Sequence, residues 1–166
     1  FLKALKNKNI KKISSPIILV GSKKLLEDQI KFYNYKFYIN ELDKNFSKLI
    51  KCKYNQINII NVNFDYKKIF DKISNKSNIY INDCCDIAIG LINKRKVKVL
   101  INGPISKKNF LKNKYAGMTE YFASKTGNKN KEVMLIYNNN LSVSPITTHL
   151  PLKKIFSKIT KKKIIN

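Results

Sequence analysis

The sequence is 166 residues long, 43% hydrophobic, and carries a formal net charge of +24. This length and apolar content suffice for one folded domain with a hydrophobic core, which excludes a disordered chain. No apolar run approaches the roughly 18 residues that span a bilayer, and the N-terminus lacks a signal-peptide pattern. We therefore expect a cytoplasmic protein without a membrane partner.

The positive charge comes almost entirely from lysine, because Arg95 is the only arginine. Proteins that read nucleic acids favour the bidentate fork of arginine, whereas these lysines are spread along most of the sequence. Enrichment in lysine, asparagine and isoleucine is also what AT-rich codons produce. We expect a solvated basic surface and no specific nucleic-acid partner.

The three cysteines, Cys52, Cys84 and Cys85, lack the spacing of a metal site. The adjacent pair falls on a predicted helix, where a mutual disulfide would be strained. We expect all three to be buried, reduced thiols.

The first part of the sequence predicts a strand followed by a helix. An apolar run at 16–21 ends in glycine, Ser22 is a predicted N-cap, and residues 23–32 have a helical pattern. A further strand is predicted near 57–62. Residues 33–76 carry no motif that indicates a function.

The middle of the sequence predicts a second strand-and-helix unit. Apolar residues recur at three- and four-residue spacing from 79 to 93, which predicts a helix with one buried face. The run at 96–101 predicts a strand that ends at an Asn-Gly-Pro turn. A short helix is predicted at 118–126.

The last part predicts a hairpin, with strands at 132–137 and 141–146, and Pro151 in the first turn of a final helix. Strands that alternate with helices, plus one hairpin, predict an α/β fold with a mixed, largely parallel sheet and flanking helices. We expect residues 16–20 and 97–101 to share one sheet with the hairpin strands.

Two segments carry residues suited to binding a ligand. His149, the only histidine, follows a predicted strand, and ligands gather at strand carboxyl ends in open α/β sheets. The alternative is a histidine with a structural role. Gly117 and Thr119 lie at the start of the predicted short helix, whose N-terminus with a free hydroxyl suits an anionic substrate. The alternative there is a simple turn that Thr119 caps.

Three motifs in order are more specific than any one of them. Asn-Gly-Pro-Ile-Ser-Lys is followed by Ala-Gly-Met-Thr-Glu-Tyr-Phe-Ala and then by Thr-Thr-His-Leu-Pro-Leu. This set resembles the 4-hydroxythreonine-4-phosphate dehydrogenase family of pyridoxal phosphate biosynthesis, most clearly over 79–160 and less over 16–32. The resemblance implies that residues 1–166 are one incomplete α/β unit, with a fold like that of isocitrate and isopropylmalate dehydrogenases. It would correspond to most of the N-terminal half of a family chain, as a truncated copy.

The resemblance also implies an activity. Family members oxidise 4-phosphohydroxy-L-threonine, a small phosphorylated hydroxy amino acid, with NAD and a divalent metal such as zinc, magnesium or cobalt, and the product loses carbon dioxide. They work as homodimers. By this match Thr119 contacts the substrate and His149 is a metal ligand. Met118 stands where the family has a substrate-binding histidine, and a thioether cannot donate a hydrogen bond.

Two other functions compete with this one. The chain could belong to a dehydrogenase of another four-carbon phosphorylated hydroxy acid. It could instead be a non-catalytic, lysine-rich scaffold that binds acidic partners. Because the family's other two metal histidines lie beyond the residues of this sequence, we expect the chain to be inactive by itself.

Overall fold

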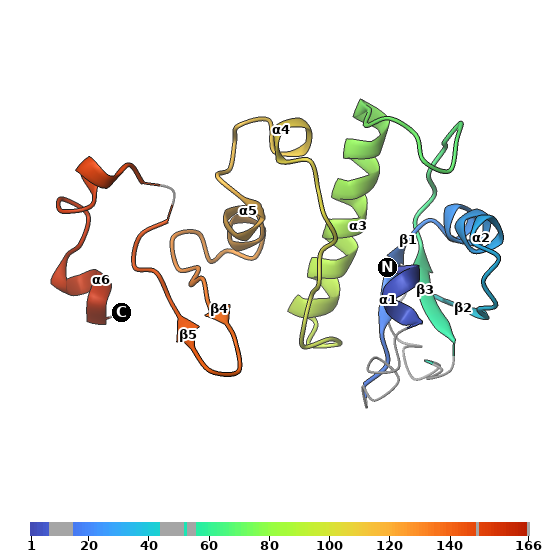
Figure 1. Cartoon of the computed structure of the whole chain (residues 1–166), viewed down its shortest axis with the longest axis horizontal. Coiled ribbons are helices and arrows are strands. Elements are labelled where there is room, and N and C mark those ends of the chain that lie inside the picture. Colours follow the sequence, from blue (N-terminus) through green and yellow to red (C-terminus); the bar gives the residue numbers. More distant parts are fainter. Residues whose placement is uncertain (7–14, 44–51, 53–55, 149, 166) are drawn as a thin grey trace. The chain divides into compact units, whose positions relative to one another are not determined.

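The computed structural model describes residues 1–6, 15–43, 52, 56–148 and 150–165. The chain divides into two compact units, an N-terminal unit, Phe1–Phe110, and a C-terminal unit, Leu111–Asn166. Figure 1 labels the helices and strands of both units. In the part of the chain that is described, no helix combines the length and the apolar character needed to cross a membrane.

The N-terminal unit is built on a parallel sheet of three strands in the order β1-β3-β2. The strands are β1 (Ile18–Gly21), β2 (Ile39–Leu42) and β3 (Ile57–Asn61). β3 lies in the centre, and its Ile59 and Ile60 are fully buried. Because successive side chains of a strand point to opposite faces, both faces of this sheet are covered.

Helices α2 (Lys23–Phe32) and α3 (Asn75–Asn93) cover the two faces of the sheet, as Figure 1 shows. One buried cluster joins Leu26 and Ile30 of α2 to Ile57 and Ile59 of β3. The other joins Leu91 of α3 to Leu42 and Ile60. The alternation along β3 thus divides the core between the two helices.

Local capping fixes where these helices begin. The Ser22 hydroxyl accepts a hydrogen bond from the Leu25 backbone N–H at 3.2 Å, as the sequence predicts. At the start of α3, Ser74 and Ser77 form a reciprocal capping box. Two short helices complete the unit, α1 (Leu2–Leu5) and α4 (Lys107–Phe110).

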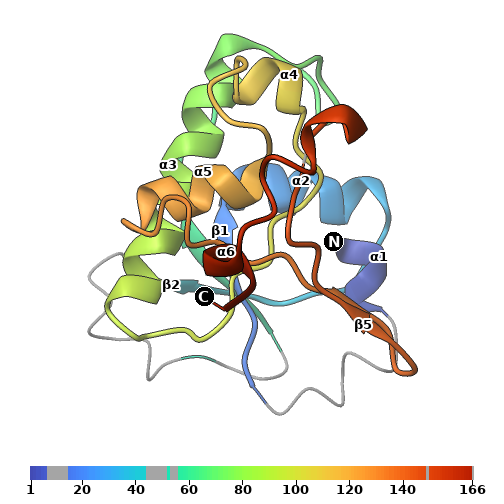
Figure 2. The ribbon, with the colours of Figure 1, turned by 90° about the vertical axis from the view of Figure 1, so that its left-hand side faces the viewer.

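The C-terminal unit holds helix α5 (Met118–Lys125) and a hairpin of β4 (Ile136–Tyr137) and β5 (Ser142–Val143), which pair antiparallel. A 3-10 turn, η3 (Leu152–Lys154), and α6 (Lys161–Ile165) follow. Figure 2 shows the hairpin extending away from α5. Both residues of each hairpin strand are exposed, so this sheet has no buried face in the part of the unit that is described.

The α/β fold class and the helices predicted at 23–32, 79–93 and 118–126 are confirmed. The prediction of one sheet is wrong, because β1 lies in the parallel sheet while β4 and β5 pair only with each other among the described residues. The strand predicted at 97–101 is also wrong, since these residues have no strand conformation and Ile101 is 90% exposed. Pro151 precedes the short 3-10 turn η3 instead of opening a final α-helix.

Candidate functional site

Met118 and Thr119, predicted as substrate-binding residues, form the first two residues of α5. Gly117 is the N-cap in an extended conformation, and no side chain caps the helix. The alternative in which Thr119 only caps the helix is therefore wrong. The Thr119 side chain is exposed and that of Met118 is half-buried. An uncapped helix start beside an exposed hydroxyl offers hydrogen-bond donors to an anionic group.

Aromatic packing holds α5 in place. Tyr121 is 5% exposed, and its ring meets that of Tyr115 edge-on at 5.5 Å between centroids. Ala123 is buried on the same helix, and the Thr126 hydroxyl donates to the Phe122 carbonyl at 2.9 Å where α5 ends. The buried face therefore anchors the helix and leaves Thr119 on its exposed side.

His149, the predicted metal ligand, lies outside the described residues. Its neighbours belong to an irregular segment after β5, in which Thr147 is half-buried and Thr148 is exposed. Whether His149 and Thr119 face one cleft stays a prediction.

The described residues do not assemble a metal site, because they contain no group of three or more His, Cys, Asp or Glu side chains placed to hold one. Cys52, Cys84 and Cys85 are free thiols, as predicted, but only Cys85 is fully buried. Burial raises the pKa of the Cys84 thiol to about 11, which keeps it protonated at neutral pH. The Cys84 thiol is therefore a poor metal ligand and a poor nucleophile.

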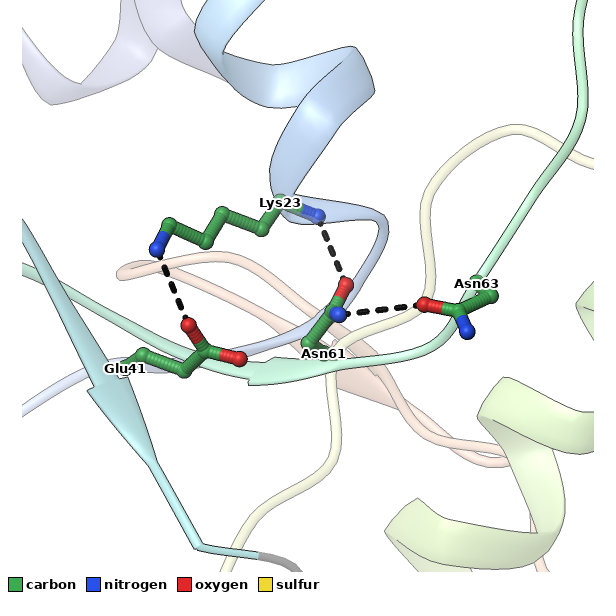
Figure 3. A network of polar contacts seen from close by, with 4 residues as sticks. All are labelled: Lys23, Glu41, Asn61 and Asn63. Atoms are coloured by element: carbon green, nitrogen blue, oxygen red, sulfur yellow. Dashed lines mark hydrogen bonds and ion pairs between the residues drawn. The ribbon is translucent and has the colours of Figure 1, made fainter.

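A second cluster of polar residues lies at the carboxyl ends of the parallel strands (Figure 3). The Lys23 backbone N–H donates to Asn61 Oδ1 at 3.0 Å, and Asn61 Nδ2 donates to Asn63 Oδ1 at 3.2 Å. The Lys23 ammonium pairs with Glu41 at 2.9 Å, which raises the pKa of Lys23. The network connects the start of α2 to the ends of β2 and β3.

Tyr80 of α3 extends this network to the other face of the sheet. Its hydroxyl accepts a hydrogen bond from the Ser22 backbone N–H at 2.8 Å. A side chain at Gly21 would bring its Cβ within 3.0 Å of the Tyr80 hydroxyl, so the absence of a side chain permits this close approach.

The polar groups of these residues form hydrogen bonds with one another. The carboxyl edge of the sheet therefore has a structural role. Sequence reasoning identified Gly21 and Ser22 as a strand end and a helix cap, but it missed Asn61 and Tyr80. No local signal marks those two, because their partners lie 38 and 58 positions away.

Comparison with known families decides what kind of protein this is. A sequence model of the family described as "Pyridoxal phosphate biosynthetic protein PdxA" matches residues 12–166. The chain belongs to this family. Among PdxA-family relatives, a 4-hydroxythreonine-4-phosphate dehydrogenase from a Sulfurihydrogenibium species is 32% identical over 167 residues, 99% of this chain and 49% of that protein. Another from Bacteroides thetaiotaomicron is 26% identical and covers 93% of this chain and 44% of that protein.

Solved structures agree on the fold. The crystal structure of a 4-hydroxythreonine-4-phosphate dehydrogenase from Burkholderia phymatum matches 98% of this chain with a TM-score of 0.82 and 20% identity. A putative enzyme of the same name from Salmonella typhimurium matches 95% with a TM-score of 0.76 and 16% identity. In both cases, as with the sequence relatives, this PdxA-family chain spans about half the length of the protein that it matches.

Proposed function

We propose that this chain is the N-terminal half of a dehydrogenase that oxidises 4-phosphohydroxy-L-threonine with NAD in pyridoxal phosphate biosynthesis. Membership of the PdxA family is the observation that carries the proposal, and the names of the sequence relatives support it. The oxidation removes a hydride from a secondary alcohol, and decarboxylation of the product follows. We place the enzyme in the cytoplasm as a homodimer.

Thr119 is the residue of this chain that we assign to the substrate. It is exposed at the start of α5, where the helix has no side-chain cap, so its hydroxyl and the free backbone N–H groups can bind an oxyanion of the substrate. Met118 beside it offers only a thioether, which makes the donor set smaller than a histidine would give. This loss leaves another four-carbon phosphorylated hydroxy acid as the alternative substrate.

We assign His149 to the metal. Zinc, magnesium or cobalt would need about three protein ligands, and the described residues supply no such group. The metal site is therefore a property that we propose for a full-length family protein, with His149 as one ligand.

A chimera tests the proposal. Residues 12–166 would replace the matching half of the Sulfurihydrogenibium relative, and NADH formation would be measured with 4-phosphohydroxythreonine and added metal. We expect turnover that His149→Ala abolishes and that Thr119→Val reduces roughly tenfold or more. The matched variant Thr119→Ser keeps the hydroxyl and should retain most activity. A folded chimera that is inactive on this substrate would refute the proposal.

A further inference from the structure

The N-terminal unit contains a cavity that the proposed dehydrogenase site does not use. It is half-open to solvent, has a volume of about 400 Å³, and is lined by Leu25 of α2, by the loop 64–73 that follows β3, by the first turns of α3, and by residues 104–110. Figures 1 and 2 both show α4 beside the start of α3. Its volume falls in the range of small-molecule sites.

The walls combine aromatic rings with positively charged side chains. The four rings that line the cavity are those of Phe64, Tyr66, Phe70 and Phe110. Lys68 and Lys72 are the two cations in the lining, Ser106 contributes a hydroxyl, and Asp71 is the one carboxylate. The Asp71 carboxylate accepts a hydrogen bond from the Lys72 backbone N–H at 2.8 Å. The lining therefore has a net positive charge next to an apolar floor.

Ser106 adds a directed donor. Its hydroxyl oxygen accepts a hydrogen bond from Asn109 Nδ2 at 2.9 Å. Among the described residues, no acceptor is found for the proton of that hydroxyl. Ser106 belongs to the Asn-Gly-Pro-Ile-Ser-Lys motif, which the proposed substrate and metal residues leave without a role.

Contacts between lining residues and their neighbours hold the walls of the cavity in position. The Asn78 side chain donates from Nδ2 to the Asn109 carbonyl at 3.0 Å, which ties α3 to α4. The Tyr66 hydroxyl donates to Asp28 of α2. The rings of Phe64 and Tyr80 stack at 4.5 Å between centroids. The cavity is thus formed before any ligand enters, which lowers the ordering cost of binding.

We propose that this cavity binds a small aromatic carboxylate, with its ring against the aromatic floor and its oxygens on Lys68, Lys72 and Ser106. Aromatic rings favour edge-on or offset contact with other rings, and lysine and hydroxyl donors suit an oxyanion. Neither Met118 nor Thr119 is among the described residues that line the cavity, and the proposal goes beyond the proposed function.

Benzoate is the probe, and binding to the 166-residue chain would be followed by NMR titration of the backbone amides. We expect benzoate to shift the amides of Ser106 and Ile81 and to bind about fivefold or more tightly than benzamide or acetate. Benzamide keeps the ring without the charge, and acetate keeps the charge without the ring. Equal binding of the three probes, or shifts confined to other residues, would overturn the proposal.

Two pairs of lysine variants separate this site from general attraction to a basic protein. Lys68→Ala with Lys72→Ala removes the two cavity cations and should weaken benzoate about fivefold. Lys67→Ala with Lys76→Ala removes two exposed lysines that do not line the cavity, and should change affinity less than about twofold. Both pairs lower the net charge equally. Equal weakening by the two pairs would show that benzoate is attracted only by the overall charge.

Discussion

Tyr80→Phe should destabilise the N-terminal unit by removing one hydroxyl. In the folded protein this hydroxyl accepts from the backbone N–H of Ser22, and Ser22 is only 5% exposed. The variant keeps the ring and its stacking on Phe64, so the contribution of packing to the free energy of unfolding should stay nearly constant. A buried N–H without an acceptor costs about 1–3 kcal/mol, and we expect a loss of about 1.5 kcal/mol in the free energy of unfolding.

Urea unfolding followed by circular dichroism measures this loss. With a slope of about 2 kcal/mol/M, the midpoint should fall by roughly 0.5–1 M. Tyr38→Phe is the matched control, because Tyr38 is 77% exposed and its hydroxyl should contribute little. The reasoning fails if Tyr80→Phe lies within about 0.3 kcal/mol of the wild type, or if both variants lose the same stability.

Three further predictions concern the thiols, the activity and the apolar surface. Burial raises the pKa of Cys84 from 9.0 to about 11, so stability should fall as pH rises between these values. In the Cys84→Ala variant, the urea midpoint should fall less steeply as pH rises over this range. An unchanged slope would contradict burial of Cys84 as the cause. We expect no NADH from the 166-residue chain when it is assayed with NAD, 4-phosphohydroxythreonine and zinc, magnesium or cobalt. Met118→His should not restore activity. Turnover above background would show that the site is complete within these residues. Leu152 and Phe156 are 80% and 88% exposed, so Phe156→Lys should reduce concentration-dependent light scattering more than the charge-matched Asn139→Lys, and equal effects would point to charge alone.

Local signals explain which elements could be predicted from the sequence. The Ser22 cap and the spacing of apolar residues place α2 and α3, because a helix closes its hydrogen bonds within itself. A strand needs a neighbouring strand for its hydrogen bonds, and the sequence alone does not identify that neighbour. Residues 97–101 have strand propensity, yet Val99 is 71% exposed and no described strand pairs with this segment. Propensity alone therefore predicted a strand that the structure lacks.

The candidate site divides in the same way. The motif around Thr119 placed that residue at a helix start, because glycine followed by a helical pattern is a local signal. The alternative of a capping role for Thr119 was wrong, since Gly117 takes the N-cap position. Asn61 and Tyr80 could not be found, because their roles arise only when distant segments meet. The cavity was missed for the same reason, as its walls come from segments up to 85 positions apart, from Leu25 to Phe110.

The carboxyl edge of a parallel sheet is where ligand sites are expected, and in this chain that edge is occupied by the protein itself. Ser22, Lys23, Asn61 and Tyr80 use their polar groups on one another, which holds both helices against the strands. A substitution there should change the free energy of unfolding. Thr119 is exposed at the start of α5, so replacing its hydroxyl should change binding with little effect on stability. The two kinds of measurement therefore distinguish residues that support the fold from residues that bind a ligand.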